Sequence, residues 1–316
     1  MLHVGVDLGG TNIAAGIVDK EGRILLKRSV PTFRERNPEE IIQDMCMLIE
    51  SLIEEKNLTL RDIKSIGIGS PGLHDRQNGI TIYNSNLGFN NVPVRDMVQN
   101  RLNIPVYLEN DANCAAIAES VSGAAKGEEH AVIITIGTGI GGGVIINKKL
   151  YTGFNGAGGE LGHVVIALDG EPCSCGRKGC WEAYSSATAL IRQTKKAAEE
   201  NTNSKIWEII GGNPDKIDAK TAFEAARLGD ETGRSVVENY IEILSEGLAN
   251  MANIFQPGVI VIGGGVSKEG ENLLAPLREK VRKKACFFEG IGEPRIEAAQ
   301  MGNDAGIVGA AFIAEL

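Results

Sequence analysis

Two stretches of this 316-residue chain share one pattern: an apolar strand, a turn of glycine and threonine, and a second apolar strand. The first covers residues 3–19 as HVGVDLGGTNIAAGIVD, and the second covers residues 131–147 as AVIITIGTGIGGGVIIN. Asp7 aligns with Thr135 and Gly9 with Gly137, and this offset is the size of a domain. The repeat predicts two similar α/β halves, each of which opens with a β-hairpin.

The spacing of apolar residues predicts the helices and strands that follow each hairpin. A helix is expected over residues 38–56, and Asp111 opens another after a short strand. Further helices are expected around 184–200 and 232–254, and the closing residues 302–316 also have a helical pattern.

These elements predict how the chain divides into domains. We expect a small N-terminal α/β domain of residues 1–118, to which a C-terminal helix of about 302–316 returns. A larger C-terminal α/β domain of residues 119–301 would carry a cysteine-rich loop.

The composition of the chain disfavours two classes of binding partner, nucleic acids and membranes. The chain has 32 basic and 41 acidic residues, a net charge of −9, and no cluster of Lys and Arg with interleaved aromatics. We therefore expect no nucleic-acid partner, since that binding depends on phosphate neutralisation. No apolar run approaches the roughly 20 residues that span a bilayer, and no leader precedes the first strand. These features predict a cytoplasmic protein without a membrane partner.

The glycine turns can be read in more than one way. Gly137, Gly139 and Gly142 satisfy the G-x-G-x-x-G spacing of dinucleotide-binding folds, but a strand pattern follows them where that motif needs a helix. The phosphate loop G-x-x-x-x-G-K-[ST] is absent from the sequence. The turns with Thr11 and Thr138 could bind phosphate through backbone N–H groups and hydroxyls. Each could also be a purely structural hairpin turn.

An acidic residue stands where a strand pattern gives way to a helix, in YLENDANCAA. Asp111 could be the N-cap of that helix, a common position for aspartate. It could also be a general base that accepts the proton of a hydroxyl during phosphoryl transfer. Both roles are compatible if different atoms perform them.

Two further carboxylates are candidates for binding adjacent hydroxyls. Glu160 lies in NGAGGELGHVV, where the glycines indicate a loop that ends in a strand. One carboxylate can accept hydrogen bonds from two neighbouring hydroxyls of a sugar. Glu182, in CWEAYSSATAL, is a second candidate. Each could instead be a solvent-facing charge.

Three cysteines and a histidine are clustered as H-x9-C-x-C-x4-C, formed by His163, Cys173, Cys175 and Cys180. Three thiolates and an imidazole complete a tetrahedral structural zinc site. The alternatives are free thiols or a disulfide, which a reducing compartment disfavours. The remaining cysteines are expected to be ordinary buried residues: Cys46, Cys114 and Cys286.

The segments DLGGT, GTGIGGG and IGGGVS together resemble the sugar-kinase, hexokinase and actin superfamily. The resemblance implies an α/β, two-domain actin/hexokinase-like (ribonuclease-H-like) fold, in which ATP and Mg²⁺ bind and sugar occupies a cleft between the domains. The nucleotide-binding residues that it implies are Asp7, Gly10, Thr11, Asn12, Gly137, Thr138, Gly139, Gly264 and Gly265.

ENDANCAA, and GGELGH followed by the cysteine pattern, resemble the bacterial ROK sugar kinases, and GCWEAYSSATAL resembles the ROK glucokinases. The resemblance implies Asp111 as the base, a structural zinc on the cysteine cluster, phosphorylation of glucose at its 6-hydroxyl, and a homo-oligomer (dimer or tetramer). In this family one nitrogen of the histidine binds zinc and the other faces the sugar. The sugar-binding residues that it implies are Gly72, Asn86, Asn110, Asp111, Glu160, His163 and Glu182.

Other functions remain open within this resemblance. The chain could phosphorylate N-acetylmannosamine, fructose or allose, since a few pocket residues distinguish such kinases. It could also be a sugar sensor without catalytic activity. ROK repressors carry a DNA-binding segment ahead of the kinase-like part. Here VGVDLGGT begins almost at the first residue and the chain is acidic, so a repressor is not expected.

Overall fold

The computed structural model describes residues 1–288 and 290–315. The chain divides into two compact units. Unit 1 comprises Met1–Ala131, Gly143–Gly159 and Gln300–Leu316, and unit 2 comprises Val132–Gly142 and Glu160–Ala299.

Two five-stranded sheets carry the fold. The strands of the first are β1 (Leu2–Leu8), β2 (Asn12–Val18), β3 (Ile24–Pro31), β4 (Ile63–Ser70) and β8 (Val106–Asn110). The strands of the second are β9 (Ala131–Ile136), β10 (Ile140–Ile146), β11 (Lys149–Tyr151), β12 (Val259–Gly264) and β13 (Arg295–Ala298).

The two sheets have matching strand orders, β3-β2-β1-β4-β8 and β11-β10-β9-β12-β13. In the first, β2 pairs antiparallel with β1 and β3, while β4 pairs parallel with β1 and β8. In the second, β10 and β11 are antiparallel and β12 and β13 are parallel. This order confirms the prediction of two similar halves that each open with a hairpin.

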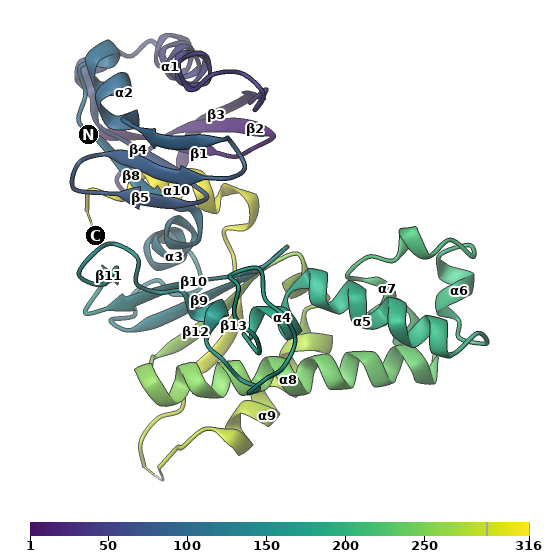
Figure 1. The fold of residues 1–316 in the computed structure, drawn as a ribbon. Coiled ribbons are helices and arrows are strands. Elements are labelled where there is room, and N and C mark those ends of the chain that lie inside the picture. Colours follow the sequence, from purple (N-terminus) through teal and green to yellow (C-terminus); the bar gives the residue numbers. More distant parts are fainter. Residues whose placement is uncertain (289, 316) are drawn as a thin grey trace. The chain divides into compact units, whose positions relative to one another are not determined.

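Helices cover both faces of the first sheet. They are α1 (Pro38–Glu55), α2 (Val94–Leu102), α3 (Asp111–Ser122) and α10 (Ala305–Ala311). One apolar cluster joins α1 and α2 to one face, and another joins α3 and α10 to the opposite face (Figure 1). A small sheet of order β5-β6-β7, which the sequence analysis did not predict, consists of β5 (Leu73–Asp75), β6 (Ile80–Asn84) and β7 (Phe89–Val92).

Local sequence determines where helix α1 begins and which of its faces is buried. Asn37 accepts the backbone N–H of Glu40, and the Glu40 side chain accepts the N–H of Asn37, which forms a capping box around Pro38. The residues at helical spacing on its inner face are buried: Ile41, Ile42, Met45, Cys46, Leu48, Ile49, Leu52 and Ile53. The predicted helix over 38–56 is confirmed.

The C-terminal helix α10 packs closely against the first sheet at two glycines of that sheet. A β-carbon at Gly5 would lie 1.8 Å from the Ile307 carbonyl oxygen, and one at Gly67 would lie 1.7 Å from that of Ala310. Only glycine permits such close contact between a helix and a strand. We expected a helix over 302–316, but α10 ends at Ala311, and residue 316 lies outside the described residues.

Unit 2 is richer in helix. Its α-helices are α4 (Glu182–Ser185), α5 (Ala187–Glu200), α6 (Ile206–Ile209), α7 (Thr221–Arg227), α8 (Glu231–Phe255) and α9 (Glu271–Lys284). Short 3₁₀ turns occur in the chain at Leu60–Asp62, Leu161–His163, Pro214–Lys216, Val266–Glu269 and Gly302–Asp304. Trp181 is fully buried and packs against Gly247 of α8, where a β-carbon would lie 2.0 Å from its ring. The helices predicted around 184–200 and 232–254 are confirmed as α5 and α8.

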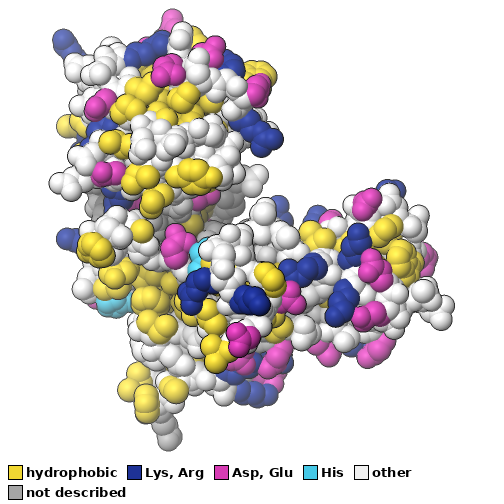
Figure 2. Space-filling model, viewed as in Figure 1, with side chains coloured by type: hydrophobic (Ala, Val, Ile, Leu, Met, Phe, Trp, Pro, Cys, Tyr) yellow, Lys and Arg dark blue, Asp and Glu magenta, His cyan; other side chains and the backbone are white. Residues whose placement is uncertain are grey.

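Charges are mixed on the face shown in Figure 2, where basic and acidic side chains are interspersed. Within residues 1–288 and 290–315, no helix is both long and apolar enough to cross a membrane.

Candidate active site

The first glycine turn joins β1 to β2 in unit 1. Gly9 donates its N–H to the carbonyl of Asn12 over 3.0 Å, which closes the turn. Gly10 packs so tightly against Asn86 that a β-carbon would lie 3.2 Å from that side chain. Thr11 and Asn12 are exposed, so the turn presents a hydroxyl and an amide to solvent.

Asp7 lies in β1 beside this turn, and its carboxylate is close enough to Asp111 to sense its charge. Burial, and then the negative charge of Asp111, raise the pKa of Asp7 from 3.8 to about 6. Gly306 of α10 lies against this carboxylate, since a β-carbon there would be 2.5 Å from Oδ2. A desolvated carboxylate that faces a second negative charge is stabilised by a bound cation.

Asn110 and Asp111 stand where β8 ends and α3 begins. Asn110, and not Asp111, is the N-cap: its Oδ1 accepts the N–H of Ala112 over 2.9 Å. Asp111 is the first helical residue, and its Oδ1 also accepts that N–H over 2.9 Å. Although Asp111 keeps an exposed surface, the atoms packed around its carboxylate desolvate it and raise its pKa, against the opposing bond from Ala112.

Gly72 is held beside this helix start. It has a φ of +104°, and a β-carbon would lie 2.2 Å from the Tyr83 carbonyl oxygen, so only glycine suits the position. Its own carbonyl accepts Nδ2 of Asn110 over 3.2 Å. Unit 1 therefore brings Gly72 and Asn110 into direct contact.

His74 is a buried polar residue near this site that the sequence analysis missed. Its Nε2 lies 2.9 Å from the Ser70 carbonyl oxygen, and its Nδ1 lies 3.2 Å from the Thr81 hydroxyl. Burial lowers the pKa of the imidazole, so the ring is neutral at pH 7. The negative charge of Asp111 acts against this shift, which places the two side chains within electrostatic reach.

The second glycine turn joins β9 to β10. Gly137 donates its N–H to the Gly139 carbonyl over 2.9 Å, and its own carbonyl accepts the N–H of Ala187, at the start of α5, over 2.9 Å. Glu182 Oε2 accepts the N–H of Ile140 over 2.9 Å. A β-carbon at Gly139 would lie 2.2 Å from that oxygen, so a larger residue there would displace the carboxylate. The Glu182 carboxylate thus supports the turn.

Unit 2 also brings the IGGGVS segment to this turn. Gly265 donates its N–H to the Ile136 carbonyl over 3.1 Å, directly before Gly137. Gly264 has a φ of +91°, and a β-carbon there would lie 2.1 Å from the same carbonyl oxygen. The two segments of unit 2 that the resemblance assigns to nucleotide binding are therefore neighbours.

The ligand atoms of His163, Cys173, Cys175 and Cys180 all lie within 4.8 Å of one another. Cys173 Sγ lies 3.5 Å from His163 Nδ1, and Cys175 Sγ lies 3.7 Å from Cys180 Sγ. A tetrahedral site with Zn–S bonds of about 2.3 Å has S···S edges of about 3.8 Å. The residues therefore fit a zinc ion, with Nδ1 as the histidine ligand atom and Nε2 directed elsewhere.

One of the three burial predictions for the cysteines outside the cluster is wrong. The expectation of a buried residue is confirmed for Cys46 and Cys114, but Cys286 is exposed, because it lies in the irregular segment that follows α9. Burial and the neighbouring thiols raise the pKa of Cys180 to about 12.

The loop before the cluster also differs from expectation. We predicted a glycine-rich loop ending in a strand, but Glu160 is followed by the 3₁₀ turn Leu161–His163 and a single β-bridge between Val165 and Cys180. The 3₁₀ turn ends at His163, and a ring nitrogen of this residue lies within 4.8 Å of the three cysteine sulfurs. The Glu160 side chain is exposed, and its carbonyl accepts the N–H of His163 over 3.1 Å.

One cavity of about 410 Å³ in unit 2 connects these features. Among its lining residues are Thr138 and Gly139 of the turn, Cys173 and Ser174 of the cluster loop, and Glu182. Ser174 Oγ donates to Glu182 Oε1 over 3.0 Å. The cluster loop and the glycine turn are therefore parts of one connected structure.

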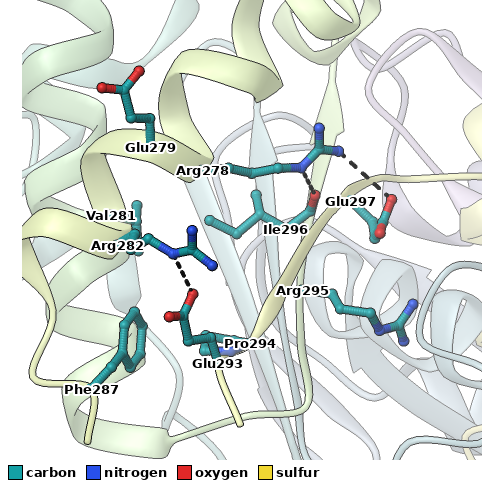
Figure 3. Close-up of a pocket in the computed structure, with 10 residues that line it drawn as sticks. All are labelled: Arg278, Glu279, Val281, Arg282, Phe287, Glu293, Pro294, Arg295, Ile296 and Glu297. Carbon is teal, nitrogen blue, oxygen red and sulfur yellow. Dashed lines mark hydrogen bonds and ion pairs between the residues drawn. The ribbon is translucent and has the colours of Figure 1, made fainter. Parts of the chain in front are cut away.

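A separate pocket of about 560 Å³ lies between α9 and β13. Two ion pairs lie within its lining, Arg282 with Glu293 over 2.8 Å and Arg278 with Glu297 over 3.9 Å (Figure 3). None of the predicted site residues lines it.

The comparisons with known proteins agree with the motifs. A family described as "ROK family" matches residues 3–316. The glucokinase of Thermotoga maritima is 40% identical over 311 residues, which are 98% of this chain and 96% of the relative. A ROK family glucokinase from Streptomyces griseus, solved in complex with glucose and AMPPNP, has a TM-score of 0.80 at 38% identity and covers 98% of both chains. A ROK hexokinase from Thermus thermophilus has a TM-score of 0.83 at 35% identity, covering 98% of this chain and 97% of that one.

These similarities show the fold class, since they extend over nearly the whole chain. The fold is the α/β fold of the ROK sugar kinases, which is actin/hexokinase-like.

Proposed function

The chain belongs to the ROK family, and on that premise we propose that it transfers the γ-phosphoryl group of ATP to the 6-hydroxyl of glucose. The observation that carries this proposal is the Asp111 carboxylate at the start of α3, beside Asp7. It is supported by the near full-length similarity to proteins named as glucokinases.

Asp111 is the general base of the proposed reaction. A sugar hydroxyl is a weak nucleophile, and a positioned carboxylate can accept its proton as the phosphoryl group is transferred. Burial raises the pKa of Asp111 toward the operating pH, and a carboxylate with a higher pKa is a stronger base. Asn110 would hold a neighbouring hydroxyl, although its amide also caps α3.

The remaining sugar contacts are assigned to both units. Gly72 and Asn86 would contribute from unit 1, and Glu160, His163 and Glu182 from unit 2. Glu182 already bonds the N–H of Ile140 and the Ser174 hydroxyl, so a sugar hydroxyl would have to share its carboxylate.

The nucleotide would bind to both glycine turns. Gly10, Thr11 and Asn12 offer the first set of donors, and Gly137, Thr138 and Gly139 offer the second. Gly264 and Gly265 would lie beside the adenosine. Asp7 would hold Mg²⁺, whose charge would relieve the unfavourable ionisation of this carboxylate. When bound, the ion neutralises charge on the transferred phosphoryl group.

Zinc would be structural in this enzyme. The cluster offers three sulfurs and one nitrogen with no position left for a substrate. Its bond to Nδ1 would fix the ring plane of His163 and leave Nε2 to meet a sugar hydroxyl. We further propose a cytoplasmic homo-oligomer, dimer or tetramer, that binds neither nucleic acid nor membrane.

A coupled assay of ADP release across a panel of hexoses tests this function. Glucose should be the best acceptor, and Asp111→Asn should abolish most of the turnover. If the protein prefers N-acetylmannosamine, fructose or allose, the assignment as a kinase stands and the assignment of glucose as its substrate is wrong. Sugar binding without turnover on any acceptor would favour a sensor and refute the catalytic assignment.

A further inference from the structure

One charged pair beside the site, in which only the carboxylate is buried, has no role in the proposed reaction. Glu109 is 1% exposed and directly precedes Asn110, at the end of β8. Its Oε2 lies 2.8 Å from Nε of Arg76, in the segment that follows β5. We propose that the pair of Arg76 and Glu109 is a positioning device that holds the Asn110–Asp111 segment in its working geometry. This inference rests on the proposed function.

The Glu109 carboxylate also bonds two residues, one on either side of Asp111. Its Oε1 accepts the backbone N–H of Asn110 over 2.9 Å and Nδ2 of Asn113 over 2.9 Å. Asn113 is 4% exposed and belongs to the first turn of α3. One buried carboxylate therefore fixes the residue before Asp111 and a residue two positions after it.

Arg76 extends this connection to a second segment. Its Nη1 donates to the hydroxyl of Thr152 over 2.9 Å, at the start of the glycine-rich stretch that leads to Glu160. Gly156 of that stretch lies against Arg76, since a β-carbon there would be 3.7 Å from its Cδ. Within unit 1, the guanidinium thus joins the residues before Asp111 to the 152–159 segment.

The backbone at Arg76 is itself fixed by a second arginine. Nη2 of Arg95 donates to the Arg76 carbonyl over 2.5 Å, and Nε of Arg95 donates to the Val106 carbonyl over 3.0 Å. Arg76 is therefore tied to the start of β8 through its backbone and to the end of β8 through its side chain. Such an arrangement resists displacement of the strand end that carries Asn110.

The position of a catalytic base affects the rate as well as its presence. A displacement of about 1 Å of a catalytic group can lower the rate by about 10²-fold. Glu109 does not need to touch the sugar for this effect, because it acts through the N–H of Asn110. If Arg76 is removed, the buried Glu109 carboxylate loses its charged partner, and the strand end should relax toward a new arrangement.

The test combines kinetics with hydrogen exchange. The variants are Glu109→Gln, Arg76→Met and the two together. The matched control is Glu50→Gln, which breaks an exposed ion pair with Arg101, 2.7 Å long, between α1 and α2. Circular dichroism and thermal melting establish that each variant folds. Kinetics with ATP and glucose are measured for each, and exchange is followed in a peptide covering residues 106–116.

Each single variant should lower kcat with glucose by about 10-fold or more, while the KM for ATP changes less than about 2-fold. The double variant should lose no more than the worse single variant, because the two residues act as one unit. Exchange at 106–116 should accelerate in Glu109→Gln and remain unchanged in Glu50→Gln.

Two results would overturn the inference: a folded Glu109→Gln protein with wild-type kcat, or losses in the two singles that simply multiply in the double. Unchanged exchange at 106–116 in Glu109→Gln would also overturn it. A wild-type protein that makes no glucose 6-phosphate would count against the proposed function alone, since the exchange measurement tests the pair without any turnover.

Discussion

Replacing Asp7 by asparagine should stabilise the ligand-free protein at pH 8 while lowering its kinase activity. The pKa of this half-buried carboxylate rises from 3.8 to about 6, because burial and the charge of Asp111 both disfavour ionisation. A pKa difference of about 2 corresponds to about 3 kcal/mol of lost stability once the group is ionised. Asparagine has the same shape and no charge, so it should recover about 2–3 kcal/mol of unfolding free energy.

The pH dependence of this gain has a definite sign. Well below pH 3.8, Asp7 is protonated in both the folded and the unfolded protein, so its ionisation has no effect on stability. As the pH rises toward about 6, the unfolded state ionises first and the folded wild type loses stability. The advantage of Asp7→Asn should therefore be complete at pH 7–8 and smaller at pH 5.

Differential scanning calorimetry between pH 5 and pH 8 without nucleotide measures this effect. The Tm of Asp7→Asn should exceed that of the wild type by about 3–5 °C at pH 8, and the difference should shrink toward pH 5. Mg²⁺–ATP should then raise the Tm of the wild type more than that of the variant. Asp62→Asn is a control of opposite sign, because hydrogen bonds from Thr59 lower the pKa of Asp62. Equal Tm values at pH 8, or an advantage that grows as the pH falls, would refute the reasoning.

Three shorter predictions concern the rest of the site. Asp111→Asn should keep the fold and glucose binding, measured by calorimetry, but lower turnover by about 10² or more; wild-type turnover would remove the base assignment. Cys175→Ala should lose zinc by elemental analysis and weaken glucose binding, whereas Cys286→Ala, which changes an exposed cysteine outside the cluster, should keep both. Gly306→Ala should lower kcat/KM for ATP about 10-fold or more, because the new methyl group would lie 2.5 Å from Oδ2 of Asp7; unchanged nucleotide kinetics would show that the carboxylate does not need its present position.

Much of the fold could be predicted because its strongest signals are local. The two hairpins, the capped helix α1 and the long helix α8 each follow from apolar spacing and turn residues within one segment. The small β5-β6-β7 sheet escaped prediction because its strands have only three to five residues, too few to show a period. Helix α9 contains Pro276, which interrupts the pattern that would have indicated it.

The contacts of α10 show a different limit. Gly5 and Gly67 stand inside strands, where glycine marks either a bulge or a close approach of another backbone. That general signal was present in the sequence. The partner was not, because Ile307 and Ala310 lie more than two hundred residues away along the chain. Local patterns indicate that something must come close, and only the tertiary structure identifies it.

The candidate site, like the fold, could be predicted only in part from the sequence. The carboxylate of Asp111 was identified as a candidate from its place between a strand and a helix, yet the capping role that competed with catalysis belongs to Asn110. Asp111 Oδ1 also accepts the N–H of Ala112 over 2.9 Å, so the candidate base still takes part in the first turn of the helix.

Glu182 shows why residue type and spacing alone cannot assign a role. As a sequence feature it is one acidic residue after a cysteine cluster, equally suited to bind a hydroxyl or to face solvent. In the structure its two oxygens join Ser174 of the cluster loop to the N–H of Ile140 after the second glycine turn. A metal that orders the cluster loop therefore also constrains the carboxylate that supports this turn. Loss of zinc should then disturb the second glycine turn as well as His163, since both are connected to the same loop through bonds within unit 2.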